Sequence, residues 1–175
     1  IQSRCQLLSF SPLDDFSMEQ WSVEQGFDSS PAELSWALEF SCGSPGLVCE
    51  ALNTGLPTLY SSTSRFLSRE DTREYTSVSV NIVKFVENSV SVWLKENPNM
   101  SKEAANRRAT NLVLGMFGLS ARGLIRGSNP DVGIAAAAVL VDIERQLSTN
   151  ISIKVLLESL SSRWAHLSMG DAVFM

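Results

Sequence analysis

The stretch VSVNIVKFVENSVSVW, residues 78–93, decides the fold class of this chain. From Val78 to Ile82 every second residue is apolar, which locally imitates a β-strand. From Ile82 to Trp93 the apolar residues instead recur at helical spacing. The pattern is too long for an ordinary strand, and no turn residue interrupts it before Asn97-Pro98. The sequence therefore predicts one long helix here.

Start and stop signals predict three short helices before this stretch. Residues 17–20, Ser-Met-Glu-Gln, form a capping-box pattern, and Gly26 is a plausible C-terminal stop. Residues 30–33, Ser-Pro-Ala-Glu, combine an N-cap serine, a proline at the first helical position and a glutamate at N3. A third helix is expected from about residue 44 to residues 53–55.

Further helices are predicted towards the C-terminus. One begins after an N-cap at Ser101, and its glycines mark either a break or close helix packing. The next opens at Asn129-Pro130, ends at Asn150, and has small residues at 135–138 that would let a neighbouring helix approach closely. Ser152 is expected to cap the last helix and Gly170 to end it. The predicted fold is all-α, with a three-helix bundle followed by a bundle of four or five helices.

Composition is that of a folded protein with a sizeable core. The chain has 175 residues, 44% of them hydrophobic and 8% aromatic. These values lie far from those of disordered chains. No apolar run reaches the roughly 18 residues that a membrane span needs, so no membrane segment is expected. The chain begins without methionine and without a signal-type segment, and we expect an upstream part.

Charge is distributed unevenly along the chain. Residues 1–60 carry eight acidic residues and one basic residue, Arg4, whereas residues 61–175 carry thirteen basic and eleven acidic residues. This shift predicts a domain boundary near residue 60, with the polar run at 68–74 as a solvated helical segment or linker. The lack of lysine and arginine between residues 5 and 64 argues against phosphate binding by the first part.

Metal and catalytic motifs are not evident. Cys5, Cys42 and Cys49 indicate a reducing compartment, and with His166 they could supply four zinc ligands, but no pair has the spacing of a structural zinc site. We interpret the three cysteines as ordinary thiols and His166 as a packed or exposed histidine. No phosphate-binding Gly-x-x-x-x-Gly-Lys-Ser/Thr loop is present, so no ATP binding by this chain alone is predicted.

Basic and aromatic residues admit two interpretations each. Five basic residues gather in one helical region after Ser101 with a single acid, Glu103, and could face DNA. Without interleaved aromatics, a solvated face or one that binds an acidic neighbour is the better interpretation. The tryptophans on apolar faces are expected to be core residues. The basic residues are Lys102, Arg107, Arg108, Arg122 and Arg126, and the tryptophans are Trp36, Trp93 and Trp164.

Three short motifs occur in a characteristic order. Residues 3–5 read Ser-Arg-Cys, residues 43–46 read Gly-Ser-Pro-Gly, and residues 150–160 read NISIKVLLESL. The first resembles the motif that ends the ATPase domain of clamp-loader subunits, the second the first turn of their lid helix, and the third the closing helix of their collar. In order and spacing the chain resembles the back half of AAA+ clamp-loader subunits of the bacterial DNA polymerase III delta-prime type.

This resemblance implies a division of the chain and a role for Arg4. Residues 1–10 would end the AAA+ ATPase domain, 11–60 would form a helical lid, and 61–175 a helical collar that holds a ring of subunits together. Arg4 would be a trans-acting arginine finger that reaches the ATP of a neighbouring subunit. Gly46 would stand where ATP-using relatives carry a sensor arginine, as in the delta-prime branch, which does not itself hydrolyse ATP. Glu158 would bind a backbone amide near the preceding helix junction.

The resemblance also implies a cellular role. The chain would be a non-catalytic subunit of the DNA polymerase III holoenzyme, a nucleotidyltransferase, in the cytoplasmic bacterial replisome. Its partners would be the gamma/tau and delta subunits through the collar, with the sliding clamp and primer-template DNA reached only through the assembled complex. No cofactor is expected in this fragment, because the family's zinc module lies in the region upstream. A gamma/tau-type ATPase subunit, which Gly46 disfavours, and an unrelated helical interaction module remain as alternatives, followed by an enzyme.

Overall fold

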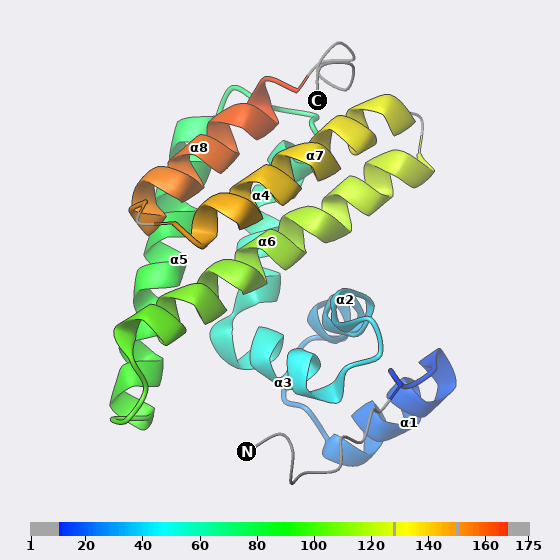
Figure 1. Cartoon of the computed structure of the whole chain (residues 1–175). Helices are drawn as coiled ribbons and strands as arrows, with labels where there is room; N and C mark the ends of the chain where they lie inside the picture. The colour runs from blue at the N-terminus through cyan, green and yellow to red at the C-terminus, as the bar shows by residue number, and fades with distance from the viewer. Residues whose placement is uncertain (1–10, 128, 150, 168–175) are drawn as a thin grey trace, which may run out of the picture. The chain divides into compact units, whose positions relative to one another are not determined.

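A computed structural model describes residues 11–127, 129–149 and 151–167, and these residues form eight α-helices and no strand (Figure 1). The predicted all-α fold class is confirmed, and residues 78–93 lie within one long helix, α5 (Tyr75–Glu96). The described residues divide into two compact units, with the boundary between Asn53 and Thr54.

The first unit contains α1 (Asp15–Gln25), α2 (Pro31–Ser41) and most of α3 (Pro45–Thr54). The predicted start of α1 is wrong, because Asp14 rather than Ser17 is the N-cap. The Asp14 carboxylate accepts a hydrogen bond of 2.7 Å from the backbone N–H of Ser17, and this bond lowers the pKa of Asp14. A carboxylate at this position also interacts favourably with the positive end of the helix dipole, so the helix begins earlier.

The other signals of the first unit are confirmed. The Ser30 hydroxyl accepts from the Glu33 backbone N–H at 3.3 Å, and the Glu33 carboxylate accepts from the Ser30 N–H at 3.2 Å, completing the capping box of α2. Gly26 ends α1 in the left-handed conformation, with φ of 61°. The buried apolar side chains of this unit are Met18, Ala37, Phe40, Val48 and Ala51.

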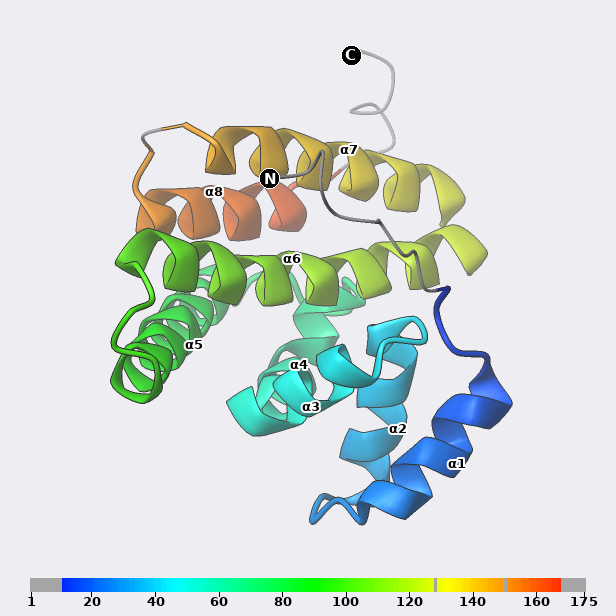
Figure 2. The same cartoon turned by 60° about the horizontal axis from the view of Figure 1, so that its bottom comes forward.

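The second unit is built around a four-helix bundle (Figure 2). The helices α5, α6 (Lys102–Arg126), α7 (Pro130–Leu147) and α8 (Ile153–Ala165) each pack on the next, and α8 packs back on α5. A further helix, α4 (Leu56–Leu67), lies against α5 and α6. This arrangement lets each helix of the bundle bury an apolar face against two neighbours.

Three details of the second unit differ from expectation. Helix α4 was not predicted, although Leu56, Leu59, Thr63 and Phe66 follow helical spacing and are buried. Helix α6 continues without a break through all of its glycines, because its buried face packs along two other helices. Helices α7 and α8 end at Leu147 and Ala165, before the predicted stops at 150 and 170, and both of those positions lie outside the described residues.

The core of the bundle contains two of the three predicted core tryptophans. Trp164 is fully buried and packs edge-to-face on Phe117, with ring centroids 4.8 Å apart and an interplanar angle of 89°. Trp93 is buried at the end of α5. In the first unit Trp36 is only half-buried and stacks on Phe40 at 5.1 Å.

Arg69 fastens the turn after α4 to the end of α8. Its guanidinium donates hydrogen bonds to the carbonyl of Trp164 and, at 2.8 Å, to the carbonyl of Leu167. The Trp164 carbonyl belongs to the last turn of α8 and otherwise accepts a long bond of 3.5 Å from the Leu167 N–H, and Leu167 follows the helix. The Arg69 cation adds a charged donor to both carbonyls and matches the negative end of the helix dipole. Arg69 holds a left-handed conformation, with φ of 65°, and burial lowers the pKa of its guanidinium.

We expect Arg69→Ala to lower the free energy of unfolding by about 1–2 kcal/mol, because two carbonyls lose a charged donor. Arg73→Ala is the matched control, since Arg73 lies in the same connection between α4 and α5 and pairs with Asp71 while its side chain remains 89% exposed. It should change stability by less than about 0.5 kcal/mol. Urea unfolding followed by circular dichroism measures both. Equal effects of the two changes would contradict the proposed fastening by Arg69.

Candidate functional site

Arg4, the predicted arginine finger, lies outside the described residues, as do its neighbours Ser3 and Cys5. Its role therefore stays a prediction. The other two motifs that carry the resemblance lie on described helices, at the start of α3 and along α8.

Gly46 lies in the first turn of α3 and is exposed. A Cβ built at this position would have no described atom within 4 Å, and the backbone there is not in the left-handed region. Neither close packing nor backbone conformation thus requires glycine here. The described part of the fold has room for a larger side chain, so the choice of glycine calls for an explanation other than packing.

The motif at 150–160 falls on the start and middle of α8. Ser152 is the N-cap, as predicted, but its hydroxyl makes no capping hydrogen bond. Leu156, Leu157 and Leu160 are buried in the bundle. Glu158 is exposed and accepts no hydrogen bond from a described residue, so the predicted contact with a backbone amide is not present in this part of the chain.

The predicted basic residues do not form one surface. All belong to α6, but Lys102 begins this helix and Arg126 ends it, about 36 Å apart at the rise of an α-helix. Arg108 lies over the Trp93 ring, with its guanidinium carbon 4.5 Å from the ring centroid. This cation–π contact gives Arg108 a structural role in fixing α6 against the end of α5.

The described thiols and the histidine belong to different units, and Cys5 lies outside the described residues. Cys42 is exposed and Cys49 is partly buried in the first unit, whereas His166 follows α8 in the second. The His166 ring packs edge-on to Tyr75, and its Nδ1 lies 2.7 Å from the Ser162 carbonyl oxygen. No group of three potential metal ligands occurs among the described residues.

Helix α7 carries an exposed apolar stripe. Ile134 is 52% exposed and Val141 is 48% exposed, and they lie two helical turns apart on one face with the half-buried Ala138 between them. On its other side α7 buries Ala135, Ala136, Val139 and Ile143 in the bundle. The apolar surface of α7 is therefore wider than the part that the described residues bury. An apolar face of this kind is typical of a surface that meets another protein.

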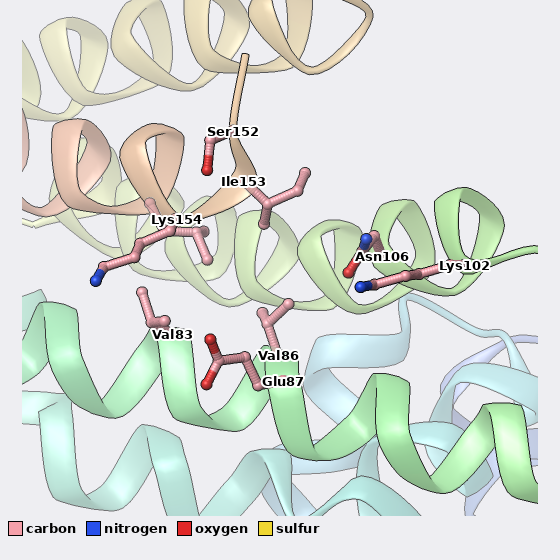
Figure 3. A pocket seen from close by; sticks show the side chains of 9 residues that line it. Val83, Val86, Glu87, Lys102, Asn106, Ser152, Ile153 and Lys154 are labelled. Atoms are coloured by element: carbon pink, nitrogen blue, oxygen red, sulfur yellow. The ribbon is translucent and has the colours of Figure 1, made fainter. Parts of the chain in front are cut away.

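A pocket of about 290 Å³ lies where α5, α6 and α8 meet (Figure 3). Its apolar lining comes from Val83, Val86, Ile153 and Leu157, and its polar lining from Glu87, Lys102, Asn106, Ser152 and Lys154. Sequence reasoning did not find this site. The only signal available was a lysine in the first turn of each of two predicted helices, whose mutual proximity depends on the fold of the bundle.

No helix within the described part of the chain has both the length and the apolar character needed to cross a membrane. Comparison with protein-family models, with curated proteins and with solved structures gives no match to this chain.

Proposed function

We propose that this chain is the lid and collar part of a clamp-loader subunit of the delta-prime type, and that it assembles with other subunits rather than catalysing a reaction. The observation that carries the proposal is the order of the three motifs at 3–5, 43–46 and 150–160. The second coincides with the start of α3 and the third with α8, the closing helix of a helical bundle. The two compact helical units are compatible with a lid followed by a collar.

Several features favour the delta-prime type over an ATPase subunit. Gly46 supplies no guanidinium for nucleotide, although the described surroundings have room for a larger side chain. The first sixty residues offer no cation beyond Arg4 to meet a phosphate. In this proposal the chain works in the bacterial cytoplasm, binds gamma/tau and delta subunits through its second unit, and reaches the clamp and DNA only within the complex.

The surface on α7 formed by Ile134, Ala138 and Val141 is the best candidate for a subunit contact. Apolar side chains at the centre of an interface supply much of the binding free energy, and a charge buried there without a partner is costly. The alternative of an unrelated helical interaction module would use the same surface for a different partner. Identity of the partner therefore decides between the two.

We expect the chain to co-elute with gamma/tau and delta subunits of the same source in size-exclusion chromatography. Val141→Glu should weaken this association at least about tenfold, because it places a charge in the contact. Folding should be unchanged, since the side chain is exposed. The affinity can be measured by titrating labelled chain with the partner subunits.

Val92→Glu is the matched control, because Val92 is 50% exposed on α5, away from the stripe. It should leave both association and thermal midpoint close to those of the unchanged chain. Failure of the unchanged chain to bind any clamp-loader subunit would refute the proposed function. Equal losses from the two substitutions would instead exclude the α7 stripe as the contact.

A further inference from the structure

The pocket between α5, α6 and α8 contains two lysines where helix stability disfavours them. Lys102 is the first residue of α6, and Lys154 is the second residue of α8. The start of a helix carries partial positive charge, so a cation there is unfavourable and an acid would be stabilising. Both lysines nonetheless line the same pocket, and neither forms an ion pair with a described residue. Two lysines at unfavourable helix starts that line one pocket indicate a functional site.

Two neutral polar groups at the pocket also have no hydrogen-bond partner among the described residues. The Ser152 hydroxyl makes no capping bond although it stands at the N-cap, and the Asn106 amide makes no hydrogen bond with a described residue. Both groups can donate a hydrogen bond. The Lys102 side chain reaches towards the middle of the pocket, whereas Lys154 lies at the opposite edge with its amino group directed away from Lys102 (Figure 3). The pocket therefore offers several donors that the described fold does not use.

The apolar part of the pocket lining limits the kind of ligand that the pocket can bind. Val86 and Leu157 are buried, and Val83 and Ile153 are partly exposed at the pocket. Glu87 is the one acidic residue in the lining, and it comes from α5 beside Val86 (Figure 3). The lining thus carries one net positive charge beside an apolar surface. A fully hydrated inorganic anion would leave that surface unused, whereas an anion with a hydrocarbon part would cover it.

We propose that this pocket binds a small organic carboxylate with a short apolar body. The carboxylate lies towards Lys102, with the Asn106 amide as a further donor, and the hydrocarbon part contacts Val86 and Leu157 on the way to Ser152 at the other side of the pocket (Figure 3). The volume of about 290 Å³ is at the lower end of that of ligand pockets, so a ligand of few carbons fits. This inference does not depend on the proposed role in a clamp loader.

Hexanoate is the probe for the whole chain of 175 residues, with binding followed by the backbone amide shifts of an NMR titration. We expect saturable binding with a Kd of about 1 mM or somewhat above, weakening as salt is added. The shifts should centre on Lys102, Asn106 and Ser152. Hexanamide, which lacks the charge, and acetate, which lacks the apolar body, should each bind at least about fivefold more weakly.

Substitutions of the charged lining residues should change the affinity for hexanoate in opposite directions. Lys102→Gln should weaken hexanoate binding about three- to tenfold, and Lys154→Gln should weaken it less because Lys154 lies at the opposite edge of the pocket. Neither change should harm folding, because each removes a positive charge from a helix start. Glu87→Gln should tighten binding by a similar factor. Lys95→Gln, on α5 outside the pocket lining, should have little effect. Absence of saturable binding, equal binding of hexanamide, or an unchanged Kd in both pocket-lysine variants would overturn the proposal.

Discussion

Replacing Gly133 by alanine is expected to lower the free energy of unfolding of the second unit by about 2–3 kcal/mol. Gly133 lies in the first turns of α7, where this helix comes into close contact with α6. A Cβ built on it would lie 2.6 Å from the backbone nitrogen of Ile125 and 2.5 Å from its Cγ1. The Ile125 side chain could rotate away, but its backbone is fixed within α6, so the two helices would have to separate. Thermal and urea unfolding followed by circular dichroism measure the loss.

Gly118→Ala is the matched control on the same pair of helices. Gly118 lies inside α6, and a Cβ there would meet no described atom within 4 Å. Alanine is favoured over glycine inside a helix by up to about 1 kcal/mol, so this substitution should raise stability. The two glycine-to-alanine changes thus have opposite expected signs. If Gly133→Ala were also stabilising, the close approach of α6 and α7 at this point would be wrong.

The same pair of helices shows how far the sequence could predict the fold. The small residues at 135–138 indicated that a neighbour would come close to α7, and α6 does pack along it. A contact too close for a Cβ, however, falls at Gly133, outside that stretch. The glycines of α6 that suggested a break lie in an unbroken helix. Composition indicates that close packing is possible, but the axial offset of two helices determines which residue lies at the contact.

Local signals predicted local structure well where one residue clearly suited the position. Ser30 with Pro31 and Glu33 left no better start for α2, and the capping box is formed. At α1 two starts were available, and Asp14 competes successfully with Ser17 because its charge adds to the capping bond. Helix α4 was missed since its Gly55-Leu56-Pro57 start resembles a turn, and its stability comes from burial against α5 and α6.

The candidate sites differ in how far they could be predicted from the sequence. Arg4 was identified from the Ser-Arg-Cys tripeptide and from the spacing between this motif and two others along the chain. Its predicted role rests on that spacing. The pocket lysines lie more than fifty residues apart, and only the packing of α6 and α8 on α5 brings them together. No local pattern could have paired them, because side chains from separate helices meet through tertiary structure.

Arg4→Ala in the intact subunit is expected to reduce ATP hydrolysis by the assembled clamp loader while leaving assembly largely unchanged. In the proposed function its guanidinium lies beside the ATP of a neighbouring subunit and stabilises charge that develops mainly in the transition state. Loss of an arginine finger lowers turnover at one site on the order of 10³-fold or more. The whole complex should therefore lose about the share of its ATPase that this site contributes. DNA- and clamp-stimulated ATP hydrolysis by a reconstituted complex measures this loss.

Arg4→Lys distinguishes a finger from a simple positive charge, because lysine keeps the charge but lacks the planar fork that meets phosphate oxygens with two donors. It should restore little of the lost turnover. Arg73→Ala, which removes an exposed arginine of the second unit, should leave turnover unchanged. Wild-type turnover in the Arg4→Ala complex would exclude Arg4 from catalysis. A large fall in the thermal midpoint of the Arg4→Ala subunit would instead assign Arg4 to the stability of the fold. An arginine finger that acts across an interface stabilises the transition state at the neighbouring subunit and does not contribute to the core of its own chain.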